Sequence, residues 1–380
     1  MKIAYLHNLP LEYYPPASNF LDLAGQSKEA EVRVFTTHNR KQRKEYESEA
    51  IKITRSNPPD PQAFAPWRLL VALWWHLRTA ISLLSLRPDA IIYVEPHSAI
   101  AAYLYCRFFQ GSARLFIHHH EFYELENYDR PGMRMPRLGN HLERSYLFQR
   151  AVWISQTNMD RLRLAKRDNP DISSSVWNIL PNYPPQTWAE RTPARFQQAM
   201  RSPLRLIYVG SASFEDTYIE EIVRWAAAFP EQVELHVCGY NVAPDVWDWL
   251  AKEQFANVSY DARGYVYEDL PSVLETFDIG LVLYKGNTTN FIYNVPNKVF
   301  EYLQCGLDVW YPVEMAAIRN FQFQSPDSLR ELNFARLNEL LPNKPPAFDR
   351  HSEAGSFYTS ERAFAPLLKK LGIEQQATRV

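Results

Sequence analysis

The sequence is poor in glycine and cysteine, and each shortage excludes a class of protein. Only 12 of the 380 residues are glycine, and neither GxGxxG nor GxxxxGK[ST] occurs. Because these patterns let the backbone approach a phosphate closely, their absence argues against a dinucleotide oxidoreductase and a P-loop nucleotide hydrolase. The three cysteines, Cys106, Cys238 and Cys305, form no CxxC pair. They exclude a disulfide scaffold and a cysteine-built zinc site, and they fit a reducing compartment.

The sequence also lacks a long uninterrupted apolar run and an excess of either charge. Its most apolar stretch, Trp67–Leu86, is interrupted by Arg68, His76 and Arg78, so the sequence predicts no membrane-spanning helix. The net charge of −2 argues against a nucleic-acid partner, which normally requires a basic excess. Residues 1–185 nevertheless carry a net charge of +5 and the remainder −7. This asymmetry is either chance variation or the mark of a first half that meets an anionic lipid surface or lipid-phosphate acceptor.

The stretch Trp67–Leu86 has two interpretations. A core-facing scaffold helix is one, and an amphipathic helix lying on anionic lipid is the other, since Trp67, Trp74 and Trp75 are close to Arg68, Arg78 and Arg87. We therefore expect a cytoplasmic protein that attaches peripherally to the inner face of the cytoplasmic membrane, with an anionic membrane surface among its partners.

Strand-like and helical segments alternate along the whole chain, which predicts an α/β fold with parallel sheets covered on both faces. The predicted strands are Lys2–His7, Glu31–Phe35, Asp89–Glu95, Arg114–His118, Ala151–Ser155, Ser175–Leu180, Leu204–Val209, Val233–Cys238, Val258–Tyr260, Ile279–Tyr284 and Leu307–Tyr311. The predicted helices are Ser18–Ser27, Pro66–Leu86, Ser98–Phe109, Pro136–Gln149, Asn158–Arg167, Asp216–Phe229, Val246–Gln254, Leu270–Phe277, Pro296–Cys305 and Ser360–Leu371.

A proline-bearing connector divides this pattern into two doubly wound domains. We predict an N-terminal domain at 1–185, a linker at 186–202, a C-terminal domain at 203–358 and a final helix at 359–380 that packs back on the N-terminal domain. Two such domains make a cleft between them, and open α/β sheets bind ligands beyond the carboxyl ends of their strands. We therefore expect the functional side chains in loops that follow strands.

The clearest local signal is the predicted helix Pro296–Cys305. Asn294 is its expected N-cap, proline fits the first turn, and Gly306 follows its end. The free N–H groups of the first turn, with Lys298 beside them, suit a diphosphate, and Glu301 one turn later suits a ribose diol. The competing interpretation is a capped helix with a solvated lysine and glutamate.

This segment also carries a resemblance to a known family. Residues 297–309, NKVFEYLQCGLDV, resemble the NKxxEYLxxGxPV pattern of the donor-site helix in GT-B glycosyltransferases, especially the large retaining family 4. Other stretches resemble that family's motifs in the same order: VWNILPNYP at 176–184, LIYVG at 206–210, GYV and DLP within 264–271, and FDIGLVLY at 277–284. Two departures stand out. Tyr293 occupies the place of the family's first acid, and residues 210–216 hold no basic residue.

The resemblance implies two Rossmann-like domains facing across a cleft, the second binding a nucleotide-diphosphate sugar and the first binding the acceptor. Aromatic and backbone groups after strands at Tyr240 and Tyr265 suit a nucleobase, although plain packing explains them too, and Arg263 is a candidate for the missing diphosphate cation. The full set of candidate donor-binding residues is Gly210, Ser211, Ser213, Tyr240, Arg263, Tyr265, Asn297, Lys298 and Glu301.

In the first half, a strand closes on His118-His119-His120-Glu121. Strand alternation places His118 and His120 on one face. They form a weak metal site, or structural histidines bonded to backbone, or the acceptor-side His-Glu pair of the resembled family. In the last interpretation His120 and Glu121 are catalytic and orient or deprotonate the acceptor hydroxyl.

Glu95 and His97, after the preceding strand, extend this acceptor side together with His118. The competing interpretation is that Glu95 and His97 form a plain helix N-terminus without a functional role.

The sequence therefore predicts a metal-independent, retaining glycosyltransferase without a cofactor, which moves a sugar from a nucleotide-sugar donor to a glycan or lipid-linked acceptor during cell-surface polysaccharide or glycolipid synthesis. Two alternatives remain: a sugar-nucleotide 2-epimerase with the same two-domain architecture, and a non-catalytic scaffold that only binds sugar nucleotides.

Overall fold

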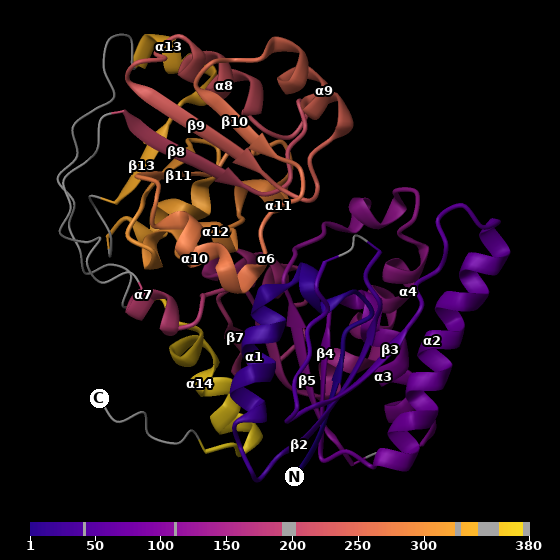
Figure 1. Cartoon of the computed structure of the whole chain (residues 1–380). Helices are drawn as coiled ribbons and strands as arrows, with labels where there is room; N and C mark the ends of the chain where they lie inside the picture. Colours follow the sequence, from indigo (N-terminus) through magenta and orange to yellow (C-terminus); the bar gives the residue numbers. More distant parts are fainter. Residues whose placement is uncertain (41–42, 110–111, 192–202, 324–327, 341–356, 375–380) are drawn as a thin grey trace. The chain divides into compact units, whose positions relative to one another are not determined.

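A computed structural model describes residues 1–40, 43–109, 112–191, 203–323, 328–340 and 357–374. The chain forms two compact units (Figure 1): unit 1 comprises Met1–Pro181 and Ala363–Val380, and unit 2 comprises Asn182–Arg362. Of the predicted linker 186–202, residues 192–202 lie outside the described residues, as do residues 341–356 of the predicted C-terminal domain.

Unit 1 is built on a parallel sheet of seven strands in the order β3-β2-β1-β4-β5-β6-β7. The strands are β1 (Lys2–Leu6), β2 (Glu31–Thr37), β3 (Lys52–Ser56), β4 (Ala90–Val94), β5 (Arg114–His119), β6 (Ala151–Gln156) and β7 (Trp177–Ile179). The order of the strands reverses at β1, so β1 and β4 flank a topological switch point, where open α/β sheets bind their ligands.

Helices cover both faces of this sheet because each central strand is apolar on both sides. Ile3 and Tyr5 of β1 face one layer, and Ala4 and Leu6 face the other. The helical segments of unit 1 are η1 (Leu11–Tyr13), α1 (Pro15–Gly25), α2 (Ala65–Leu86), α3 (Pro96–Phe108), η2 (Leu125–Asp129), α4 (Arg134–Leu142), the π-helical turn η3 (Glu143–Leu147), α5 (Phe148–Arg150), α6 (Met159–Asp168) and η4 (Ser174–Val176).

The last described helix, α14 (Ser360–Leu371), packs against unit 1. It lies beside α1 (Figure 1), and the rings of Phe364 and Phe20 are 5.4 Å apart. The segments that cross between the units are also joined to each other, since the Ser360 N–H donates to the Pro184 carbonyl oxygen at 2.8 Å. The chain therefore returns to unit 1 beside the point where it leaves.

Unit 2 repeats the scheme with six parallel strands in the order β10-β9-β8-β11-β12-β13. The strands are β8 (Leu204–Val209), β9 (Val233–Cys238), β10 (Val258–Asp261), β11 (Ile279–Leu281), β12 (Asp308–Pro312) and β13 (Leu329–Leu332). The switch point of this sheet is between β8 and β11. The helical segments are α7 (Thr187–Arg191), α8 (Ile219–Ala227), α9 (Pro244–Glu253), η6 (Tyr267–Asp269), α10 (Leu270–Leu274), α11 (Thr289–Ile292), α12 (Asn297–Gln304), η7 (Ala316–Phe321), η8 (Phe334–Arg336) and α13 (Leu337–Leu340).

By length and composition, the 22-residue helix α2 is apolar enough to cross a membrane. The sequence predicted no membrane-spanning helix here, because basic residues interrupt the apolar stretch. Its second half packs on the sheet of unit 1, where Thr79, Leu83 and Leu86 are buried. The expectation that Trp75 belongs to an exposed face is wrong. Its side chain is 5% exposed, and its indole N–H donates to the Thr36 carbonyl oxygen at 3.3 Å.

Candidate functional site

In unit 2, the start of α12 lies against Gly210, the residue that follows β8. A Cβ atom added to Gly210 would be 2.2 Å from the Lys298 Nζ atom, so any side chain here would displace this ammonium group from its place. The helix begins one residue later than predicted. Pro296, not Asn294, is its N-cap, because Pro296 has extended backbone angles (φ −66°, ψ 150°) and Asn297 is the first helical residue. No side chain caps this helix.

Lys298 is a buried cation. Its Nζ atom has no hydrogen-bond acceptor among the described residues. Two aromatic rings partly compensate for this burial: Nζ lies 4.4 Å from the ring centre of Tyr208 and 5.1 Å from that of Tyr284. Because burying an ammonium without an acceptor is costly, the arrangement suits an anion that binds beside it.

The first turn of α12 adds backbone donors at the same place. An α-helix leaves its first N–H groups without intrahelical partners, and these groups carry partial positive charge. Helix α12 has eight residues, and Lys298 is its second. A diphosphate is the natural ligand for N–H groups and an ammonium held together in this way.

Glu301 follows Lys298 on the next turn and is also buried. Burial raises the pKa of its carboxyl group to about 7, and the charge of Lys298 opposes this shift. Near neutral pH the carboxyl group therefore exists in both protonation states. It can accept a hydrogen bond from a hydroxyl group in either state, as a ribose-binding group must.

Other predicted donor residues form hydrogen bonds within their own loops or with neighbouring loops. Ser213 Oγ lies 3.2 Å from an Asp216 carboxylate oxygen, and Ser211 Oγ lies 3.4 Å from the Tyr284 hydroxyl. The hydroxyl of Tyr240 donates to the Tyr265 carbonyl oxygen at 2.9 Å.

Arg263, the candidate second cation, is bound by its near neighbour. Its side chain is 90% exposed, and its guanidinium forms an ion pair with Asp261 at 3.2 Å. The structure thus brings Gly210, Lys298 and Glu301 together and gives Arg263 a carboxylate partner in its own loop.

In unit 1, Glu95 follows β4 at the switch point and is held in an unusual conformation. Its φ of 64° is in the left-handed region, which is rare and strained for a residue with a side chain. One carboxylate oxygen accepts the backbone N–H groups of His120 (2.6 Å) and Glu121 (3.0 Å), and the other, Oε2, is buried without a partner among the described residues. Burial raises the pKa of this carboxyl group to about 7.

The three consecutive histidines are divided between two environments, as strand alternation predicts. His118 Nε2 lies 3.2 Å from His120 Nδ1, and the His120 ring stacks on Tyr14 with ring centres 5.3 Å apart. His119 points the other way, where its Nε2 is 3.0 Å from a Glu143 carboxylate oxygen. Burial lowers the pKa of His119, but the charge and hydrogen bond of Glu143 raise it above its usual value overall.

Further groups complete this edge of unit 1. Glu121 Oε2 forms an ion pair with the buried guanidinium of Arg161 at 3.1 Å, and Arg161 also donates to the His120 carbonyl oxygen. Burial lowers the pKa of His97 to about 4, so this ring is neutral at physiological pH. The described residues contain no group of three or more His, Cys, Asp and Glu side chains placed to hold a metal ion.

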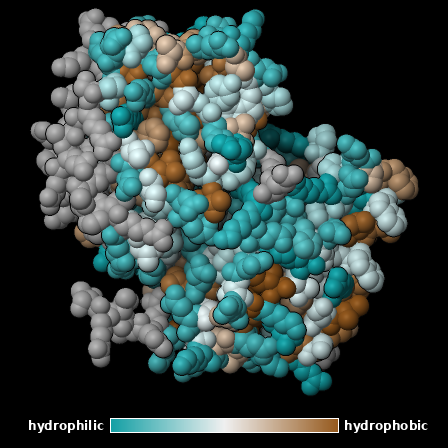
Figure 2. Space-filling model, in the orientation of Figure 1, coloured by the Kyte–Doolittle hydropathy of each residue, from teal (hydrophilic) through white to brown (hydrophobic). Residues whose placement is uncertain are grey.

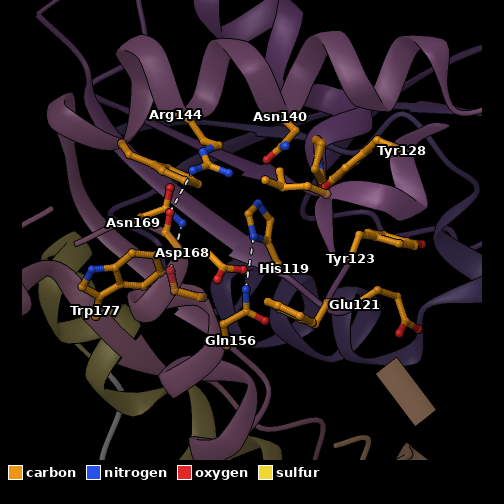
Figure 3. Close-up of a pocket in the computed structure, with 15 residues that line it drawn as sticks. His119, Glu121, Tyr123, Tyr128, Asn140, Arg144, Gln156, Asp168, Asn169 and Trp177 are labelled. Atoms are coloured by element: carbon orange, nitrogen blue, oxygen red, sulfur yellow. Dashed lines mark hydrogen bonds between the residues drawn. The ribbon is translucent and has the colours of Figure 1, made fainter. Parts of the chain in front are cut away.

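A small polar pocket opens beside these histidines (Figure 3). His119 and Glu121 line it together with Arg144, whose guanidinium donates to the Asp168 carbonyl oxygen at 2.9 Å. Its volume is about 40 Å³, and one water molecule needs roughly 10–15 Å³ of such volume. The pocket therefore has room for a few water molecules and not for a sugar ring.

Comparison with known proteins gives a structural likeness only. No protein-family model and no curated protein matches the sequence. The sucrose-phosphate synthase of Thermosynechococcus elongatus superposes with a TM-score of 0.66 at 13% identity, covering 98% of this chain and 99% of that one. HepE of Anabaena, in complex with UDP, gives a TM-score of 0.61 at 11% identity over 98% and 100%. The UDP-GlcNAc 2-epimerase of Neisseria meningitidis, bound to UDP-GlcNAc, gives 0.61 at 13% identity over 98% and 99%.

These likenesses cover nearly the whole chain, so they establish its architecture. With its two parallel sheets, the chain has the α/β GT-B fold that the sequence resemblance implied. At 11–13% identity the likeness extends to the fold and no further. Because transferases and an epimerase share this fold, the reaction must be argued from the residues of the site.

Proposed function

We propose that the protein is a glycosyltransferase that takes a sugar from a nucleotide-diphosphate sugar and passes it to a hydroxyl group of a glycan or lipid-linked acceptor. The observation that carries this proposal is the buried Lys298 ammonium at the first turn of α12, for which the described part of the chain offers no hydrogen-bond acceptor. UDP bound to HepE and UDP-GlcNAc bound to the Neisseria epimerase support a nucleotide-sugar ligand for this fold.

Each part of the site has a role in this proposal. Lys298 and the first N–H groups of α12 stabilise the negative charge that develops on the leaving diphosphate, which is usually the largest contribution to catalysis. Glu301 holds the ribose. In unit 1, His120 or Glu121 accepts the proton of the attacking hydroxyl group, and Glu95 positions both through their backbone N–H groups. Retention of configuration and independence from metal ions remain predictions of the sequence resemblance.

A sugar-nucleotide 2-epimerase is the second candidate, because one observation favours it. An epimerase needs acids and histidines gathered around one sugar, and unit 1 gathers Glu95, His118 and His120 at the carboxyl ends of β4 and β5. The two reactions differ in their need for an acceptor, since the epimerase reaction consumes none.

Donor binding tests the shared part of both candidates. Titration calorimetry with UDP should give saturable binding to the wild type. Lys298→Ala should weaken it about 10- to 100-fold, because a charge-assisted hydrogen bond contributes about 1.5–3 kcal/mol. Arg263→Ala, which removes an exposed cation already paired with Asp261, is the matched control and should bind as the wild type does. Equal affinity of the Lys298 variant and the wild type would contradict the proposed diphosphate site.

Product analysis then separates the candidates. The protein is incubated with a panel of nucleotide sugars, with and without extracted cell-envelope lipid. Release of nucleotide only in the presence of lipid supports the transferase, and an isomerised donor without lipid supports the epimerase. Donor binding with neither product would support a non-catalytic scaffold.

A further inference from the structure

The first half of α2 is not packed into the core of unit 1. None of the residues from Ala65 to Trp74 is buried, and Trp75 is the first buried residue of the helix. The next residue, His76, is buried and lies 3.5 Å from the Asn8 side chain, just beyond the carboxyl end of β1. At 1.5 Å per residue, these ten residues form about 15 Å of helix. Figure 1 draws this part of α2 pointing away from the sheet of unit 1.

The exposed side of α2 is apolar along most of its length. Trp67, Leu70, Trp74, Leu77 and Ile81 recur at intervals of three and four residues, so they share one side of the helix. Between 47% and 60% of each of these residues is exposed. Figure 2 shows hydrophobic side chains along the margin where Figure 1 draws α2. We call these five residues the α2 stripe.

The charges on α2 have a single sign. The helix contains no Asp or Glu, and its two charged residues, Arg68 and Arg78, are both exposed. Tryptophan and arginine are the residues that a lipid headgroup region favours, because the ring is apolar with a polar edge and the guanidinium binds phosphate. The chemistry of the surface is thus complementary to anionic lipid.

We propose that the α2 stripe docks on an anionic lipid surface, with Trp67 and Trp74 at headgroup depth and Arg78, one turn after Trp74 on the same side of the helix, against lipid phosphates. The spacing of the stripe would also fit a second copy of the helix. A helix pair, however, normally places opposite charges beside its seam, and two copies of α2 would bring only arginines. Lipid is therefore the better occupant.

If the proposed function holds, the position of the α2 stripe also determines how a lipid-anchored acceptor would reach the site. The free half of α2 extends from the part of unit 1 at which Glu95 follows β4 and His97 lies in the first turn of α3. An acceptor with a lipid anchor would reach these residues from the surface on which α2 lies. Lipid docking itself needs neither donor nor acceptor.

Vesicle co-sedimentation without nucleotide tests the proposal. We expect wild-type protein to bind phosphatidylcholine vesicles containing about a quarter phosphatidylglycerol, and to bind pure phosphatidylcholine much less. The double variant Trp67→Ser/Trp74→Ser should bind the mixed vesicles about tenfold or more weakly. Arg78→Gln should lose most of the preference for phosphatidylglycerol. Phe323→Ser, which removes an apolar side chain of unit 2 that is 94% exposed, is the matched control and should bind normally.

Three results would overturn the proposal. They are no binding of wild type to mixed vesicles, unchanged binding of the tryptophan variant, and a vesicle-free dimer in analytical ultracentrifugation that the tryptophan variant abolishes. The last result would assign the stripe to a second copy. Both tryptophans are exposed, so circular dichroism should show the variant to be folded. Because UDP titration is separate from this assay, either proposal can fail alone.

Discussion

The structure places two carboxyl groups, Glu95 and Glu301, where burial opposes their charge. For each of them burial raises the pKa from 4.5 to about 7 in the folded protein. The folded state therefore binds more protons than the unfolded state between about pH 4.5 and 7. Each group contributes stability that is complete below about pH 4.5 and is lost as the pH rises through about 7.

Glu95→Gln tests this linkage at a single residue. Glutamine keeps an oxygen for the two backbone N–H groups but has no charge, so the variant should lose less stability than the wild type between pH 4.5 and 8. We expect a difference on the order of 2–3 kcal/mol across this range, measured by urea denaturation at several pH values. Glu253→Gln, at an exposed position, is the control. Parallel curves for Glu95→Gln and the wild type would contradict the raised pKa.

At the scale of elements, the place of α12 depends on a glycine in the strand behind it. Gly280 is the middle residue of β11, and a Cβ atom there would be 2.1 Å from the buried ring of Tyr302 on α12. The Tyr302 hydroxyl accepts the backbone N–H of Val209 at 3.0 Å, which ties α12 to the end of β8. Close contact between the strand and the helix therefore sets the position of Lys298.

Gly280→Ala should displace α12 and weaken both folding and donor binding. Overpacking in a core typically costs about 1–3 kcal/mol, so we expect a loss of that size in the free energy of unfolding, together with weaker UDP binding by calorimetry. Gly25→Ala is the control, because its new methyl group would meet the flexible end of Ile51 at 3.2 Å. A fully stable Gly280 variant with normal UDP affinity would show that the helix does not depend on this contact.

Sequence patterns predicted the elements with strong local signals and missed those without them. Strands β8 and β9 and helix α14 begin and end where their apolar patterns predict. Strands β3 and β13 were not predicted. Both are short edge strands, KITRS and LREL, whose charged residues hide the apolar run that marks a buried strand.

The site was predictable only in part, for a similar reason. Lys298 and Glu301 lie on the same helix, α12, so the local sequence pattern is enough to predict them. Tyr208, Glu143 and Arg161 reach their sites from other elements, and only the tertiary fold brings them close. The sequence indicated the position of Arg161 in part, because the N-cap Asn158 places it in the first turn of α6, just after β6. No local pattern indicated that Arg161 contacts Glu121.

At the scale of the whole molecule, unit 1 depends on the end of the chain. Phe364, Leu367, Leu368, Leu371 and Ile373 are all buried in the same core cluster as β1 and α1. The Arg114 guanidinium donates to the Leu371 carbonyl oxygen at 2.7 Å, which fastens the end of α14 to β5. Helix α14 therefore belongs to the hydrophobic core of unit 1.

Leu368→Ala should destabilise unit 1 selectively. The side chain is 1% exposed, and removing such a leucine typically costs about 2–5 kcal/mol. Hydrogen exchange should show lower protection of β1, β4 and β5, with unit 2 unchanged. Lys369→Ala, at the neighbouring exposed position, should leave both units as they are. Uniform loss of protection across both units would contradict the independence of the two cores.

Unit 1 is made of two segments of the chain, and unit 2 lies between them in the sequence. This arrangement affects the order in which the two units can fold during synthesis. A ribosome exposes the first 181 residues long before it makes Ala363 and the residues that follow. Until α14 is made, the face of α1 that packs against it stays exposed. Unit 2 is continuous in sequence, so it can fold as it leaves the ribosome. Chaperones that bind apolar surfaces should therefore bind this protein at α1, and should be released once α14 has been made and covers that face.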